Sequence, residues 1–222
     1  MPIVAWEVLA LSALAALFVL LSLRTRRMGP VAGLVRDVAY AAVALAVSLT
    51  LVIRVNRYGF ERLGIGFTHL GTASVLLGLV TVVGLAGLVA LCRLKGRPTV
   101  LTGNMAKLML VYPPWAYVQH LLVMGVFINL VSDWLGKGAA VAIGGLAFGA
   151  IHWNHGRLFF ALTLAIGSAW GWAFLTSPNL LPLAASHGVL ATCTYYWIRG
   201  EDKWADIFAP GFRAAATTSA SR

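Results

Sequence analysis

Long apolar runs separated by short polar segments dominate the chain. Runs without charged side chains extend over residues 8–23, 38–53, 70–92, 108–132 and 138–151, and the stretch 158–200 is almost free of charge. About 20 apolar residues cross a bilayer as a helix, so 158–200 is too long for one span. The turn signal Ser177-Pro178-Asn179 divides it in two. The pattern therefore predicts seven membrane-spanning helices.

Composition supports an all-α integral membrane protein. Of the 222 residues, 60% are hydrophobic and only 11% are charged, whereas soluble domains carry about 25% charged residues. A soluble fold of this size has too few polar side chains here to cover its surface. An ordinary soluble enzyme and a disordered chain are therefore excluded.

The charge is strongly positive, with a formal net value of +10. The basic residues stand in short clusters between the apolar runs, which indicates membrane topology and contact with anionic lipid rather than nucleic acid. Most of these basic residues fall on the cytoplasmic side of the membrane if the N-terminus lies on the outer side. We therefore expect a multi-pass protein of a bacterial inner membrane, with its C-terminus in the cytoplasm. The oligomeric state stays open.

The spans suggest three parts of the chain. Residues 1–107 form an N-terminal three-span membrane segment, 108–200 a core of four spans, and 201–222 a cytoplasmic tail that is partly disordered. Gly145 and Gly149 form a GxxxG pair, as do Gly167 and Gly171. Such pairs let helices approach closely. We expect them to pack helices within the chain, with dimerisation as the alternative.

Three histidines stand inside predicted spans: His120, His152 and His187. A buried imidazole in hydrocarbon is costly unless it has a partner, so intramembrane histidines are functional candidates. Counting about 1.5 Å per helical residue places all three at a similar depth. Together they could bind Zn²⁺ or another divalent transition metal. Alternatively, each hydrogen-bonds to a neighbouring helix.

Further polar residues leave two interpretations open. Gln119, directly before His120, could orient water or substrate, or it could bridge helices. His155 follows His152 by three residues and is either a further ligand or an interfacial residue. Cys92 and Cys193 form no CxxC motif, so we expect ordinary thiols packed in helices.

The order of these residues resembles the CAAX-protease and bacteriocin-processing (CPBP, or Abi) membrane proteins, which include the prenyl-protein endopeptidases. Phe148-Gly149-Ala150-Ile151-His152 resembles the family's Phe-x-x-x-His motif, and His187-Gly188-Val189-Leu190 resembles the start of its His-x-x-x-Asn motif. The resemblance covers residues 112–199. It implies a CPBP-like helical core, metalloprotease activity, and His152 and His187 as metal ligands or catalytic residues.

The chain departs from the family pattern at several positions. Gln119 and His120 occupy the positions of the two glutamates in the family motif. Met124 occupies the position of the family's arginine, and Ala191 that of its asparagine. A glutamine cannot accept a proton as a carboxylate can. Peptidase chemistry of the usual kind is therefore in question.

Two functional hypotheses follow. The first is a divergent CPBP-type, metal-dependent intramembrane hydrolase. His120 would act as a third metal ligand or base beside His152 and His187, and Gln119 would position water or substrate. Its substrate would be a membrane-embedded or prenylated peptide, or a lipid. The alternative is a non-catalytic CPBP-fold membrane protein that binds a peptide, lipid or protein partner. A transporter is less favoured, because no carboxylate lies inside a predicted span.

Overall fold

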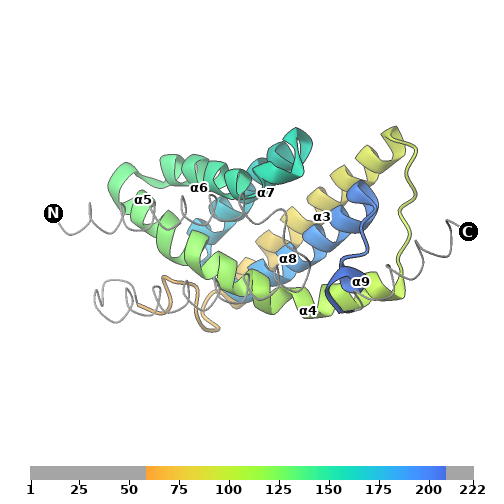
Figure 1. Cartoon of the computed structure of the whole chain (residues 1–222). Coiled ribbons are helices and arrows are strands. Elements are labelled where there is room, and N and C mark those ends of the chain that lie inside the picture. The colour runs from red at the N-terminus through yellow and green to blue at the C-terminus, as the bar shows by residue number, and fades with distance from the viewer. Residues whose placement is uncertain (1–58, 209–222) are drawn as a thin grey trace, which may run out of the picture.

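The computed structural model describes residues 59–208, and every regular element in this range is a helix (Figure 1). The predicted spans over 8–23 and 38–53, and the tail beyond residue 208, lie outside the described residues. In chain order the helices are α3 (Leu70–Leu94), α4 (Gly103–His120), the π-helix η2 (Leu121–Ile128), α5 (Asn129–Leu135), α6 (Lys137–Ile151), the 3₁₀-helix η3 (Trp153–His155), α7 (Arg157–Thr176), α8 (Leu180–Cys193), the π-helix η4 (Thr194–Arg199) and α9 (Lys203–Phe208).

Helices lie where the sequence predicts the described spans, and three of these segments have the length and hydropathy of a membrane span. The third span is α3, the fifth is α6, and α4, η2 and α5 together form the fourth. The turn at 177–179 separates α7 from α8, as predicted. Three helical segments, Leu70–Leu94, Gly103–Leu135 and Arg157–Thr176, are long and apolar enough to cross a membrane, and Lys137–Ile151 is a shorter apolar helix. The count of seven spans stays a prediction.

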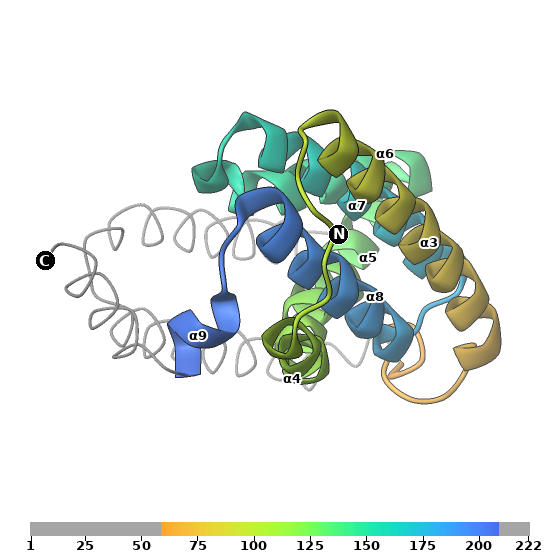
Figure 2. The same cartoon turned by 90° about the vertical axis from the view of Figure 1, so that its right-hand side faces the viewer.

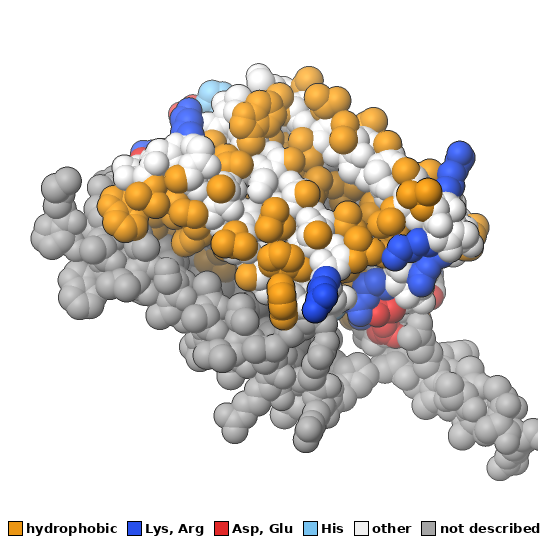
Figure 3. Space-filling model, turned by 90° about the horizontal axis from the view of Figure 1, so that it is seen from above, with side chains coloured by type: hydrophobic (Ala, Val, Ile, Leu, Met, Phe, Trp, Pro, Cys, Tyr) orange, Lys and Arg blue, Asp and Glu red, His pale blue; other side chains and the backbone are white. Residues whose placement is uncertain are grey.

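The outer surface also fits a lipid environment. Large apolar side chains along α3, including Val75, Leu79, Val82 and Val83, are more than 60% exposed. Figure 3 shows hydrophobic side chains spread over one whole face of the molecule, with Lys and Arg gathered mainly at its rim. Such a face would be costly in water and is ordinary in a bilayer.

A close approach between α4 and α8 brings the two central helices together. Figures 1 and 2 show α8 lying between α3 and α4, in contact with both. A Cβ on Gly188 would stand only 2.9 Å from Cγ of Pro113 in α4. The absence of a side chain at Gly188 therefore lets α4 pack directly against the helix turn that carries His187.

Glycines also let α6 and α7 pack closely. A Cβ on Gly145 would stand 1.9 Å from Oγ of Ser168, and one on Gly167 would stand 2.9 Å from Cβ of Phe148. A Cβ on Gly149 would lie 3.1 Å from Cβ of Leu164. This confirms that the GxxxG residues pack helices within the chain.

The loop before α3 fixes the start of α8. The side-chain amide of Asn179 donates to the carbonyls of Gly66 (3.1 Å) and Thr68 (2.9 Å), and its oxygen accepts from the backbone N–H of Leu181 (3.0 Å). The backbone N–H of Leu180 donates to the carbonyl of Gly64 (2.9 Å). Asn179 therefore caps α8 and ties it to the loop, which sets the height of His187 in the bundle.

Candidate functional site

Two of the predicted histidines form a buried pair. Nδ1 of His187 on α8 lies 3.0 Å from Nε2 of His120 at the end of α4. His120 has no exposed surface, and His187 is 2% exposed. Their similar depth, predicted from the sequence, therefore corresponds to direct contact. The π-helix η2 begins one residue after His120, and such wide turns are frequent at functional sites.

The third histidine lies at a helix end rather than inside the span. His152 follows the last residue of α6, and its Nδ1 lies 2.8 Å from the carbonyl oxygen of Phe148. A carbonyl can only accept a hydrogen bond, so Nδ1 of His152 carries the proton. The lone pair of this ring therefore lies on Nε2, which has no hydrogen-bond partner in the described part of the chain.

The tautomers of the buried pair follow from its unpartnered atom. Nδ1 of His120 is buried and has no hydrogen-bond partner within the described residues. If His187 were the donor, that atom would be a buried N–H without an acceptor, which is rarer in proteins than an unsatisfied acceptor. We infer that His120 donates from Nε2 to Nδ1 of His187, which places the second N–H of His187 on Nε2.

Aromatic rings surround the histidines. The ring of Phe148 lies 4.9 Å from that of His152, 5.5 Å from that of His187 and 5.8 Å from that of His120, between centroids. Trp170 contacts both members of the pair, at 5.0 Å from His120 and 4.9 Å from His187. Phe148 therefore contacts all three imidazoles, and Trp170 limits how the pair can turn.

A chain of hydrogen bonds holds Trp170 in place. Its Nε1–H donates to Oγ of Ser186 (2.9 Å), and the hydroxyls of Ser186 and Thr81 lie 2.7 Å apart. Thr81 donates in turn to the carbonyl of Leu77 (2.6 Å), so the proton between the two hydroxyls comes from Ser186. The chain crosses from α7 through α8 to α3. Sequence reasoning missed it, although Ser186 beside His187 was a polar signal within a span.

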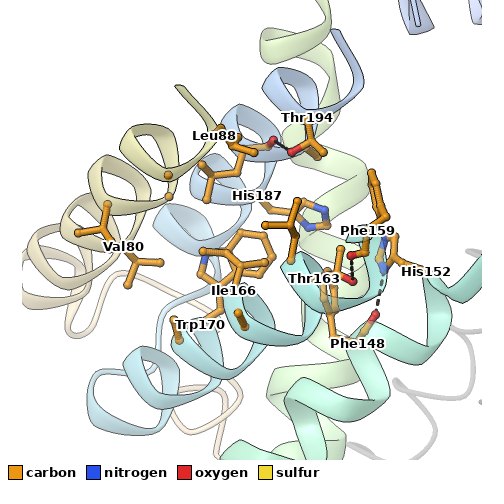
Figure 4. A pocket seen from close by; sticks show the side chains of 18 of the residues that line it. Val80, Leu88, Phe148, His152, Phe159, Thr163, Ile166, Trp170, His187 and Thr194 are labelled. Atoms are coloured by element: carbon orange, nitrogen blue, oxygen red, sulfur yellow. Dashed lines mark hydrogen bonds between the residues drawn. The ribbon is translucent and has the colours of Figure 1, made fainter. Parts of the chain in front are cut away.

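A pocket of about 680 Å³ opens beside these residues. Its walls come from α3, α7 and α8, with Tyr112 from α4 and Phe148 at the end of α6 (Figure 4). His152 and His187 both line it. The hydroxyls of Thr163 and Thr194, which also line it, donate to carbonyls of their own helices. The polar side chains at the pocket wall thus include the two histidines, each with a ring nitrogen that has no hydrogen-bond partner among the described residues, and the phenol groups of Tyr112 and Tyr195.

The pocket reaches the lipid-facing surface. Leu79 and Val83 of α3 and Trp172 of α7 line it and are more than half exposed. The pocket therefore borders the apolar outer face formed by α3 and α7. Ala191, at the position where the family resemblance places asparagine, also lines the pocket.

Other predicted residues stand apart from the pocket. Gln119 and His120 do not line it, and the side-chain oxygen of Gln119 is buried without a hydrogen-bond partner in the described range. Met124 is fully buried in the apolar core. His120 thus meets the pocket only through His187.

The three imidazoles do not complete a metal site in this arrangement. Among the described residues, no group of three or more His, Cys, Asp or Glu side chains is placed to hold a metal ion. Two imidazoles are paired with each other, and the ring of Phe148 lies against all three. The predicted Zn²⁺ or related metal therefore stays a prediction, and no chemical step is derived through it.

Charged residues gather at one end of the pocket. Arg199 donates to Nδ1 of His155 and pairs with Glu201, and its guanidinium lies 5.6 Å from the rings of Phe159 and Tyr195, which line the pocket. Partial burial and the nearby charge of Arg199 lower the pKa of His155 to about 4. His155 is therefore neutral at physiological pH and accepts a hydrogen bond from Arg199.

One comparison with known proteins covers the part of the chain that carries the three histidines. Residues 103–193 match the sequence model of a family described as type II CAAX prenyl endopeptidase Rce1-like. No curated protein and no solved structure matches the chain. The matched segment runs from α4 to the end of α8 and contains His120, His152 and His187. With its apolar helices, this indicates an integral membrane protein. Over residues 103–193 the chain is therefore similar to the Rce1-like family of type II CAAX prenyl endopeptidases.

Proposed function

We propose that this CAAX protease-like membrane protein is an intramembrane hydrolase whose substrate inserts an apolar chain into the pocket between α3, α7 and α8. One observation carries the proposal. The same apolar pocket is lined by two imidazoles, His152 and His187, and the contacts of their Nδ1 atoms leave Nε2 of each ring for a bound molecule. We infer a lone pair on Nε2 of His152 and an N–H on Nε2 of His187.

The shape and lining of the pocket favour a lipid-like substrate. Its volume falls within the range of about 300–1,000 Å³ that is usual for small-molecule sites. The walls are almost wholly apolar, so burial of a hydrocarbon chain supplies the binding free energy. A prenylated or acylated peptide, or a lipid, has such a chain next to a bond that can be hydrolysed.

The two histidines have complementary roles in the proposed hydrolysis. Nε2 of His152 takes a proton from water as the water oxygen attacks the substrate carbonyl carbon. The N–H of His187 donates to the carbonyl oxygen, which becomes negatively charged. His152 then returns the proton to the leaving nitrogen or oxygen as the carbonyl re-forms and the scissile bond breaks. The net reaction consumes one water molecule.

His120 acts through His187 in this scheme. Its hydrogen bond to Nδ1 keeps the other N–H of His187 on the pocket side. His120 is therefore a positioning residue. The predicted role of Gln119 in orienting water stays part of the proposal, although its oxygen is buried away from the pocket lining.

Hydrolysis in proteoliposomes tests the proposal. The full chain in phosphatidylcholine vesicles is offered prenylated peptides, acylated peptides and lipid esters, and products are measured by mass spectrometry. We expect His152→Ala and His187→Ala to lower the rate by about 10²–10⁴-fold, as loss of an acid–base residue does. His69→Ala, at an exposed histidine outside the pocket, serves as the control. Equal rates in all four proteins would overturn the proposal.

A non-catalytic binding protein is the second candidate. No carboxylate lines the pocket among the described residues. A carboxylate could accept a proton from water during hydrolysis, so a pocket lined without one favours binding without hydrolysis. In that case, the same vesicles would retain a prenylated or acylated compound unchanged. Binding that depends on the pocket, without any product, would favour this candidate.

A further inference from the structure

One wall of the pocket comes from outside the segment that matches the family. Helix α3, residues 70–94, precedes the matched range 103–193 and supplies Val80, Gly84, Gly87 and Leu91 to the lining. These residues lie three or four apart, so they share one face of the helix. The part of the site that meets the lipid phase is therefore not set by the Rce1-like segment alone.

Two glycines on this face have different roles. A Cβ on Gly84 would stand 2.9 Å from Cδ2 of Leu190, so this glycine lets α3 pack on α8. A Cβ on Gly87, which is exposed and also lines the pocket, would meet no atom of the described residues within 4 Å. The space beside Gly87 is therefore unoccupied at the pocket wall and is not needed for packing among the described helices.

The facing helix also presents a small residue. Ala165 of α7 lines the pocket and is exposed. Gly87 and Ala165 thus lie on the two helices between which the pocket reaches the lipid-facing surface. His187, which is 2% exposed and whose Nε2 has no hydrogen-bond partner within residues 59–208, lies farther inside the same pocket.

We propose that Gly87 is a specificity-determining residue, which leaves room between α3 and α7 for the apolar chain of a membrane-embedded substrate. This rests on the proposed function. The occupant is a single hydrocarbon chain, because the opening is continuous with the lipid-facing surface of α3 and α7. A larger side chain at Gly87 narrows the opening without disturbing the bundle.

Photolabelling tests this inference. The full chain in phosphatidylcholine nanodiscs is mixed with hexadecanol that carries a terminal diazirine, irradiated and digested. Label on the α8 peptide with Leu190 and Ala191 reports entry into the pocket. Label on Val75 and Val82, which face lipid outside the pocket, reports the bulk membrane and normalises the signal.

Gly87→Leu and Ala165→Leu narrow the opening from its two sides. Displacing about two methylenes of the chain from the pocket corresponds to roughly a tenfold loss of binding. We therefore expect about tenfold less normalised α8 label in each variant. Gly78→Leu is the matched control, because Gly78 lies on the same helix, has no atom within 4 Å of an added Cβ and does not line the pocket.

The outcomes separate the two proposals. Strong α8 label in the wild type, lost in Gly87→Leu and kept in Gly78→Leu, supports the role of Gly87. Strong label that is equal in all variants overturns that role and leaves the proposed function standing. Absence of α8 label in the wild type shows that the pocket admits no chain from the bilayer, and it overturns both.

Discussion

His120 and His187, which are 67 positions apart in the sequence, share a 3.0 Å contact between ring nitrogens in the interior of the bundle. Two bare imidazoles are seldom buried together, because each has two nitrogens to satisfy. Here one contact satisfies a nitrogen of each ring, Nδ1 of His120 has no partner within residues 59–208, and the remaining nitrogen of His187 is left for the pocket. The hydrogen bond within the pair therefore lowers the cost of burying the two rings and fixes the orientation of His187.

Removal of the Ser186 hydroxyl tests whether Trp170 positions the pair. Ser186→Ala leaves the indole N–H of Trp170 without its acceptor and removes the contact of Ser186 with the hydroxyl of Thr81, which keeps its bond to the carbonyl of Leu77. We expect a loss of about 1–3 kcal/mol in unfolding free energy, typical for a buried group left unsatisfied, and altered ¹⁵N shifts of the His187 ring. Ser186→Thr keeps the hydroxyl and should restore the shifts. Unchanged shifts in Ser186→Ala would show that the chain is purely structural.

If the three histidines bind a metal, the side chain of Phe148 should hinder that binding. Each imidazole nitrogen must come within about 2.0–2.1 Å of a zinc ion, and the Phe148 ring contacts all three imidazoles. We therefore expect Phe148→Ala to bind more Zn²⁺ than the wild type, by elemental analysis of the purified protein.

The matched controls for this experiment remove the ligands. His152→Ala and His187→Ala in the Phe148→Ala background should lose the metal. If neither the wild type nor Phe148→Ala holds zinc after the ion is added back, the predicted metal site is wrong. Zinc retained without both histidines would place it elsewhere in the chain.

The glycine contacts predict different tolerance at two positions of α6. A Cβ on Gly145 collides with Oγ of Ser168, whereas one on Gly138 meets nothing within 4 Å. We expect Gly145→Ala to destabilise the protein by about 1–3 kcal/mol through overpacking, measured as a lower Tm in detergent. Gly138→Ala should leave the Tm unchanged or raise it, since alanine favours the helix. Equal Tm values would contradict the packing of α6 on α7.

The contact between His155 and Arg199 predicts a pH dependence. The pKa of His155 is lowered to about 4, against about 6.5 in an unfolded chain. Between these values the unfolded state binds more protons, so the stability is complete above about pH 6.5 and falls as the pH drops towards 4. His155→Gln should therefore reduce the slope of Tm against pH in this window. A slope of Tm against pH in His155→Gln that equals the wild-type slope would contradict the lowered pKa of His155.

Much of the fold could be predicted because it follows from local pattern. The apolar runs predicted α3 and α6, and Ser177-Pro178-Asn179 predicted the break between α7 and α8. The GxxxG spacing predicted helix packing within the chain. The two spans before residue 59 and the orientation in the membrane stay predictions.

The site was predictable only in part. Counting residues along the predicted helices placed His120 and His187 at one depth. The contact between the two rings also depends on Gly188, which lets Pro113 of α4 approach α8 closely. His152 was expected inside its span and lies at a helix end, where its ring bonds the carbonyl of Phe148. The Trp170–Ser186–Thr81 chain joins three helices, and no periodicity along one helix indicates which faces will meet.

The central claim is that His152 presents a lone pair and His187 an N–H to the same apolar pocket. Solid-state ¹⁵N NMR of the histidine-labelled full chain in lipid, assigned with single His→Gln variants, measures it directly. We predict that His152 carries its proton on Nδ1 and His187 on Nε2, both neutral at pH 7. His152 protonated on Nε2, or His187 on Nδ1, would contradict the account.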